Sequence, residues 1–160
     1  MRWRAEAAAL QLFWWIMGLL SPERASATGD WLLRRLGPRS GKMRRIKANL
    51  AMAFPEKDAA EIDHIARGVL GNLGAVMAEL AHLDNITDLD RDDPCVELVN
   101  LNRDPAFLQR SKPVIFVSAH LGNWELMALA AAIEFGIPFN VMVRPLDFLP
   151  MDCVLTEIRS

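Results

Sequence analysis

Residues 113–143 read PVIFVSAHLGNWELMALAAAIEFGIPFNVMV, and this stretch decides the fold class. The run at 113–117 is unbroken β-branched and aromatic sequence, which is typical of a strand buried on both faces. Residues 123–135 are helical in character, Gly136-Ile137-Pro138 closes the helix, and 139–143 is strand-like again. Strand, helix and strand form a βαβ unit, so we predict an α/β fold with parallel strands and a right-handed crossover.

Two ionisable residues follow the predicted strands, where ligands bind in parallel sheets. His120 follows the first strand and Arg144 the second. Glu125, in the first turns of the predicted helix, can reach His120, fix its tautomer and leave the other ring nitrogen as a base. The same spacing also arises by chance, as a surface histidine beside a helix-start glutamate. For Arg144 the alternative is an edge salt bridge with Asp147.

The amino-terminal segment is apolar and is followed by basic residues. Residues 7–20 read AAALQLFWWIMGLL, which as a helix spans about 21 Å, short of the ~30 Å hydrocarbon core. Residues 1–47 carry a net charge of +7 (ten Lys/Arg, three Asp/Glu), and residues 48–160 carry −9 (eight and seventeen). A basic segment that is also apolar favours a membrane surface over nucleic acid. We expect residues 1–24 to form a membrane anchor or interfacial helix, with the rest facing the cytoplasm; the alternative is a buried helix of a soluble core.

Helices are predicted for the intervening chain. Pro22–Leu36 and Lys42–Ala53 form two short helices separated by Gly37-Pro38, and a long helix begins in the acidic stretch 56–61 and runs to Leu83. On this long helix Gly68, Gly71 and Gly74 line a stripe where another backbone could approach closely. His64 and His82, on the same helix, are expected to be surface or packing histidines.

Composition excludes several classes of protein. The chain is 52% hydrophobic and 24% charged, so it is not disordered. Its cysteines, Cys95 and Cys153, lie far apart without a Cys/His cluster, so we expect neither a zinc site nor a disulfide framework. No Gly-x-Ser-x-Gly motif is present, which favours direct attack by a substrate hydroxyl over a covalent acyl-enzyme.

The block Ser118–Leu126 (SAHLGNWEL) resembles the His-(four residues)-Glu signature of bacterial lipid A biosynthesis acyltransferases, a family within the lysophospholipid acyltransferase superfamily. Three further blocks resemble the same family: Val143–Asp147, Asn49–Pro55 and Gly71–Glu79. The resemblance covers nearly the whole chain.

This resemblance implies an inner-membrane enzyme, acting at the cytoplasmic face, that moves a fatty acyl chain to a hydroxyl of a lipid A precursor. The donor is acyl-carrier protein or a coenzyme A thioester, and no cofactor or metal is implied. His120 is then the catalytic base and Glu125 its orienting partner. Arg144 binds phosphate or steadies the developing oxyanion, and Asn123 also binds substrate.

Members of the family continue beyond the position of Ser160. We therefore expect residues 25–160 to be the amino-terminal portion of the acyltransferase domain, placed after the membrane helix of residues 1–24. Two alternatives remain open. The chain is a catalytically inactive membrane-binding remnant, or it is an acyltransferase of the same superfamily that acts on another acceptor, such as a phosphatidylinositol mannoside.

Overall fold

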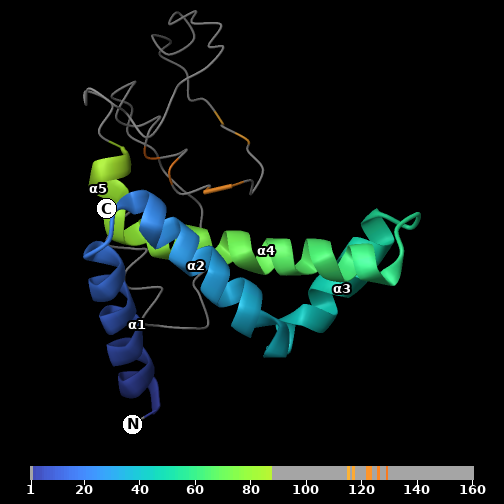
Figure 1. Ribbon diagram of the computed structural model, residues 1–160, viewed down its shortest axis with the longest axis horizontal. Helices are drawn as coiled ribbons and strands as arrows, with labels where there is room; N and C mark the ends of the chain where they lie inside the picture. The colour runs from blue at the N-terminus through green and yellow to red at the C-terminus, as the bar shows by residue number, and fades with distance from the viewer. Residues whose placement is uncertain are drawn as a thin grey trace, which may run out of the picture. The chain divides into compact units, whose positions relative to one another are not determined.

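The computed structural model describes residues 2–87 and the single positions 115, 117, 122, 123, 126 and 129. Residues 2–87 are almost entirely helical (Figure 1). The elements are α1 (Arg2–Gly18), α2 (Pro22–Leu36), the 3-10 turn η1 (Gly37–Arg39), α3 (Lys42–Ala53), α4 (Ala59–Glu79), the 3-10 turn η2 (Leu80–His82) and α5 (Leu83–Ile86). The two predicted short helices are confirmed at their predicted bounds. The long helix is confirmed too, although it ends at Glu79 and gives way to η2.

Local capping explains where α2 and α4 begin. Ser21 accepts a hydrogen bond from the backbone N–H of Arg24, and Pro22 occupies the first turn of α2, where its missing N–H costs nothing. Asp58 and Glu61 form a reciprocal capping box at the start of α4. The Asp58 carboxylate accepts from the N–H groups of Ala60 and Glu61, both at 2.8 Å, and Glu61 accepts from the Asp58 N–H at 3.1 Å. This backbone bond, with help from Lys57, lowers the pKa of Glu61.

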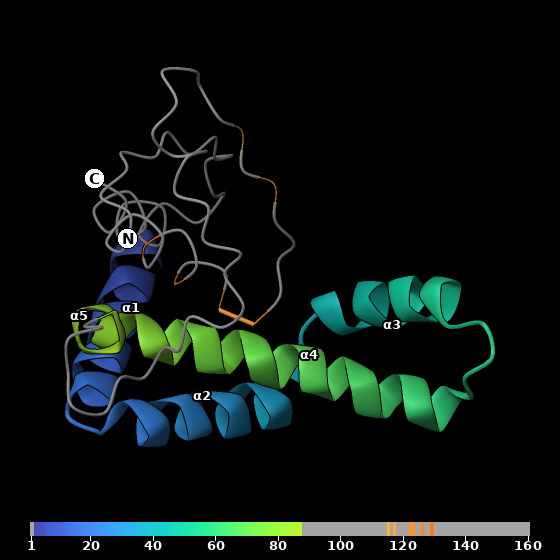
Figure 2. The same cartoon turned by 90° about the horizontal axis from the view of Figure 1, so that it is seen from above.

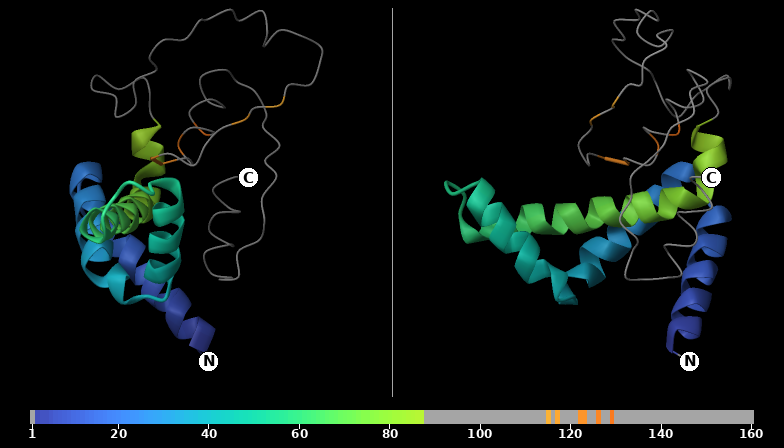
Figure 3. Two further views of the ribbon diagram at one scale, coloured as in Figure 1. Left: turned by 90° about the vertical axis from the view of Figure 1, so that its right-hand side faces the viewer. Right: turned by 180° about the vertical axis from the view of Figure 1, so that it is seen from behind.

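Helix α4 is the central element of a compact unit that spans Ala8–His82. Helix α2 lies along one side of α4 and α3 along another, as Figure 2 and the left-hand view of Figure 3 show. The most extensive contact in this unit is between α2 and α4. The unit is therefore organised by one helix crossing.

Two glycines make the crossing of α2 and α4 possible. A Cβ atom added at Gly29 of α2 would overlap the carbonyl oxygen of Gly74 in α4, and a Cβ at Gly74 would overlap the carbonyl oxygen of Gly29. Gly71 lies beneath the side chains of Asp30 and Arg34. The predicted close approach of another backbone is thus confirmed for Gly74, whereas Gly71 is approached by side chains. It does not extend to Gly68, where the nearest atom to an added Cβ is Arg34 Nη1 at 3.8 Å.

Helix α1 is attached to the end of α4 by side chains from both helices. Met17 packs with Ala25 and Ala78 in a small buried cluster. The indole Nε1 of Trp14 donates to the carbonyl of Met77 at 2.8 Å, and the His82 ring lies 2.9 Å from the carbonyl of Met17 through Nε2. His82 is buried, which confirms it as a packing histidine, whereas His64 is exposed on the surface of α4.

Helix α3 packs against the first half of α4 through apolar and charged contacts. Met43 is buried with Ala66 and Leu70 of α4. Beside this cluster, Asp63 of α4 accepts from Lys47 of α3 at 2.5 Å and from Arg67 Nε at 2.7 Å. The two cations lower the pKa of the Asp63 carboxyl. One carboxylate therefore links the two helices at the edge of their apolar contact.

The predicted parallel sheet is not found among the described residues. Ile115 and Val117, expected in a strand buried on both faces, have no strand conformation, and their exposed fractions are 89% and 92%. An apolar run becomes a strand only when a neighbouring strand supplies its hydrogen bonds and covers its faces. The expected neighbour, at 139–143, lies outside the described residues, so the α/β fold class is not confirmed.

The spanning form of the predicted amino-terminal anchor finds no support in the described part of the chain. None of the helices there combines the length and the apolar character that a membrane span requires.

The helix crossing predicts opposite effects for two glycine substitutions in α4. Gly74→Ala should lower the free energy of unfolding by about 2 kcal/mol or more, because a backbone carbonyl cannot rotate away from the added methyl group. Gly68→Ala, in the same helix, should be neutral or stabilising by up to about 1 kcal/mol, since alanine favours the helix and the site is open. Urea unfolding followed by circular dichroism measures both, and equal effects would contradict the proposed crossing.

Candidate functional site

Of the predicted site residues, the structure describes Asn123 alone. Asn123 is half-buried and lies outside regular secondary structure. Gly122, just before it, has a φ of 55°, a left-handed conformation that favours glycine. Leu126 and Leu129 are helical. The helix predicted over 123–135 is confirmed at Leu126 and Leu129 but does not include Asn123. His120, Glu125 and Arg144 lie outside the described residues, and their arrangement stays a prediction.

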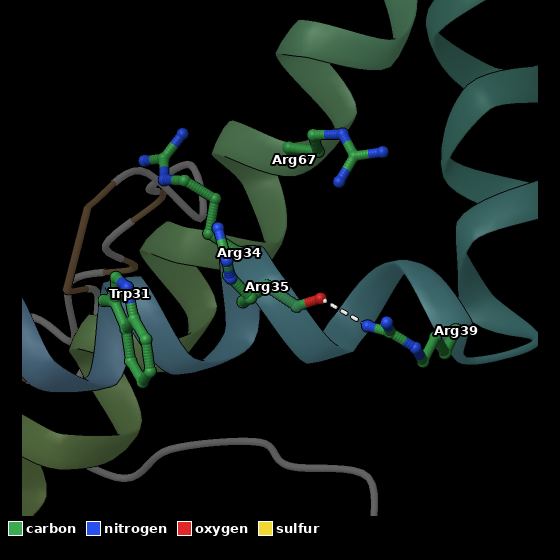
Figure 4. Close-up of a pocket in the computed structure, with 5 residues that line it drawn as sticks. All are labelled: Trp31, Arg34, Arg35, Arg39 and Arg67. Atoms are coloured by element: carbon green, nitrogen blue, oxygen red, sulfur yellow. Dashed lines mark hydrogen bonds between the residues drawn. The ribbon is translucent and has the colours of Figure 1, made fainter.

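A group of arginines lines a pocket of about 430 Å³ beside the crossing of α2 and α4 (Figure 4). Its lining residues are Trp31, Arg34, Arg35, Arg39 and Arg67. From the sequence, the arginines of residues 34–47 were predicted only as part of the basic segment of residues 1–47. Trp31 and Arg67, the latter on α4, were not predicted as part of a site. The spacing of Trp31, Arg35 and Arg39, four residues apart, is the signal that was available.

Two of these arginines are paired with carboxylates on their own helices. Arg34 donates to both oxygens of Asp30, from Nε at 3.0 Å and from Nη2 at 2.6 Å. This bidentate bond lowers the pKa of Asp30 and raises that of Arg34. Arg67 donates to Asp63, which Lys47 also contacts. Arg34 and Arg67 therefore contribute little uncompensated charge to the pocket.

Arg35 and Arg39 are different, because no ion pair to either is found within the described part of the chain. Arg39 Nη1 donates to the carbonyl oxygen of Arg35 at 3.0 Å, across the last turn of α2. A cation at this position is favoured by the negative end of the helix dipole. Residues 34–47 contain seven Lys/Arg and no Asp/Glu. The pocket thus holds two exposed guanidinium groups without an acidic partner among the residues described.

The outer surface of α1 is apolar. Its large exposed side chains are Leu12 at 55%, Trp15 at 63% and Ile16 at 42% exposed, and Leu19, just after the helix, is 67% exposed. The spacing of three and four residues from Leu12 to Trp15 and Ile16 places these side chains on one face of the helix. The neighbouring face carries Phe13 and Met17, which pack within the helical unit together with Leu20. The last turns of α1 are therefore apolar on two faces, of which one is covered.

No group of three His, Cys, Asp or Glu side chains suited to a metal ion occurs among the residues that the structure describes.

Comparison with known families identifies the class of protein. The sequence model of the bacterial lipid A biosynthesis acyltransferase family matches residues 4–160, nearly the entire chain. The protein therefore belongs to this family, and its general role is that of an acyltransferase acting on lipid-type substrates. No curated protein and no solved structure matches the chain.

The charged contact between α3 and α4 predicts a specific acid sensitivity. Because the folded-state pKa of Asp63 is lowered from its ordinary value of 3.8, its stabilising effect is present above that value and is lost as the pH falls through the folded-state pKa. Asp63→Asn should reduce stability at neutral pH and flatten the loss of stability in acid. Thermal unfolding at a series of pH values measures this.

The control for this prediction is Asp84→Asn, which changes an exposed aspartate outside the α3–α4 contact. Acid profiles that are identical for wild type and Asp63→Asn would show that the carboxylate does not stabilise the folded chain.

Proposed function

We propose that the protein transfers a fatty acyl chain from acyl-carrier protein, or from a coenzyme A thioester, to a hydroxyl of a lipid A precursor or a related glycolipid. The observation that carries the proposal is the family match over residues 4–160, which spans the complete block from His120 to Asp147. The general role comes from the family, and the donor, the acceptor and the catalytic pair are the proposal.

In the proposed reaction, His120 takes the proton of the acceptor hydroxyl while the hydroxyl oxygen attacks the thioester carbonyl carbon. The tetrahedral oxyanion that results collapses, the carbon–sulfur bond breaks, and the thiolate recovers the proton from the imidazolium. Glu125 holds the imidazole in the correct tautomer and stabilises the imidazolium. Arg144 binds phosphate or steadies the oxyanion, and Asn123 contacts substrate. In this scheme the proton moves from the acceptor hydroxyl to His120 and then to the thiolate, and no cofactor takes part.

The backbone at 122–129 supports this pairing. Gly122 has a left-handed conformation, and Leu126 and Leu129 are helical. A residue in the first turn of such a helix can fold back toward the loop that precedes it. The proposal includes a βαβ unit at 113–143, in which that loop follows the first strand and meets the carboxyl end of the second.

The proposed location is the cytoplasmic face of the bacterial inner membrane, with α1 as an interfacial helix within the anchor of residues 1–24. The support is the exposed apolar face of Leu12, Trp15, Ile16 and Leu19. A helix that lies in the membrane plane buries such a face at the boundary of headgroups and acyl chains. Tryptophan is favoured at that depth.

His120→Ala should lower the rate of acyl transfer by about 10²–10⁴-fold, the range of general-base catalysis. The measurement is the transfer of a labelled acyl chain from acyl-carrier protein to a lipid A precursor in the complete reaction. His64→Ala is the matched control, because it removes an exposed histidine of α4 and should leave the rate unchanged.

Full activity in His120→Ala would refute the base assignment. Glu125→Gln extends the same assay. Because a carboxylate favours the imidazolium, its removal should move the acidic limb of the rate–pH profile to lower pH and reduce the maximal rate. An acidic limb that stays in place would show that Glu125 does not contact His120.

Replacing Trp15 and Leu19 together by Glu should lower binding to phosphatidylcholine vesicles by about tenfold or more, because two apolar side chains lose their burial in the bilayer. Vesicle flotation of the full chain measures this. Met52→Glu, at an apolar position of α3 that is 76% exposed, is the control and should bind as wild type. Equal binding by all three proteins would contradict the interfacial role of α1. Vesicle binding without acyl transfer would favour the alternative of an inactive membrane-binding remnant.

A further inference from the structure

The pocket beside the α2–α4 crossing has a charge arrangement suited to an anion. Of its four arginines, Arg34 is satisfied by Asp30 and Arg67 by Asp63. Arg35 and Arg39 are left as exposed guanidinium groups without an ion pair in the part of the chain described. The Arg39 guanidinium donates to the carbonyl oxygen of Arg35, and both side chains line the same pocket. An anion in this pocket would offset the charge of both groups.

The chemistry of the lining favours phosphate as that anion. Guanidinium groups present paired donors that match the oxygen atoms of phosphate and bind it bidentately. Both groups reach the pocket from the row Trp31, Arg35 and Arg39, whose members are four residues apart and therefore share one face of α2 and η1. The indole ring of Trp31 is thus the first member of a row whose other two members, Arg35 and Arg39, carry guanidinium groups suited to phosphate.

We propose that this arginine pocket binds the phosphate of an anionic phospholipid headgroup at the bilayer surface. This inference rests on the proposed membrane location and goes beyond it, because it assigns a specific headgroup site to α2 and α4 in addition to the apolar contact of α1. Its lining residues belong to α2, η1 and α4.

The apolar surroundings favour a bilayer lipid over a soluble phosphate or an acidic protein. Trp31 is 60% exposed and Leu36, also on α2, is 52% exposed. A free phosphate would leave both side chains in water, whereas a headgroup region accepts a tryptophan ring beside its phosphates. The seven cations of residues 34–47, with no acidic residue among them, would add the general attraction of an anionic leaflet.

The test compares two double variants that remove the same charge. Arg35→Gln/Arg39→Gln changes the pocket, and Arg44→Gln/Arg45→Gln changes two exposed arginines of α3 outside it. Each full chain is floated with vesicles of phosphatidylcholine alone and of phosphatidylcholine mixed with phosphatidylglycerol. A cation near an anionic surface contributes about fivefold to binding, so both variants bind the mixed vesicles less well than wild type. We expect the pocket variant to lose at least about tenfold more than the α3 variant, and to bind phosphatidylcholine as wild type does.

Other results would contradict the proposed headgroup site. Equal losses in the two variants would mean that net charge alone attracts the chain to the vesicles. Unchanged vesicle binding, with a raised KM for acyl-carrier protein in the pocket variant, would assign the pocket to an acidic protein. If wild type binds neither kind of vesicle, the proposed membrane location fails, and the headgroup site fails with it.

Discussion

The close approach of Gly29 to Gly74 is the constraint on which the helical unit depends. Each glycine occupies the space that a Cβ atom of the other would need, so α2 and α4 meet backbone to backbone. Ala25 and Ala78, both fully buried, extend the same contact toward Met17 of α1. Because the two glycines carry no side chains, the helices approach closely enough to make many short contacts, each of which adds a small attraction. Such a crossing tolerates almost no added volume.

The same constraint creates the arginine pocket. Because Gly71 has no side chain, the paired groups of Asp30 and Arg34 can lie across α4. That placement satisfies Arg34 and brings α2 close enough for Arg67 to line the same hollow. Arg35 of α2 and Arg39 of η1 complete the lining. Which arginines are paired is decided within each helix, because Arg34 and Arg67 each have a carboxylate four residues earlier in the same helix.

Sequence patterns predicted the local structure well and the long-range contacts poorly. Pro22, the Gly37-Pro38 break and the acidic stretch 56–61 are local signals, and the start of α2, the end of α2 and the start of α4 lie where these signals indicate. That Gly74 meets Gly29, or that Arg67 joins Trp31, depends on pairing between distant segments, which no local pattern encodes. The strand predicted at 113–117 is not confirmed at Ile115 and Val117. A strand requires a neighbouring strand, and the local sequence does not identify that neighbour. For the site, the helical conformation of Leu126 and Leu129 agrees with the helix predicted over 123–135, while the pairing of His120 with Glu125 stays a prediction.

Apolar and basic surfaces occur together in the helical unit for a physical reason. An interfacial helix alone gains its binding energy from apolar burial, which does not distinguish one lipid from another. Exposed guanidinium groups add a component that depends on headgroup charge. On α2, Trp31 and Arg35 stand one turn apart and are both exposed, so a single helix face presents both kinds of contact. In such a face the ring fixes the depth of the helix in the headgroup layer, and that depth in turn places the guanidinium groups level with phosphate.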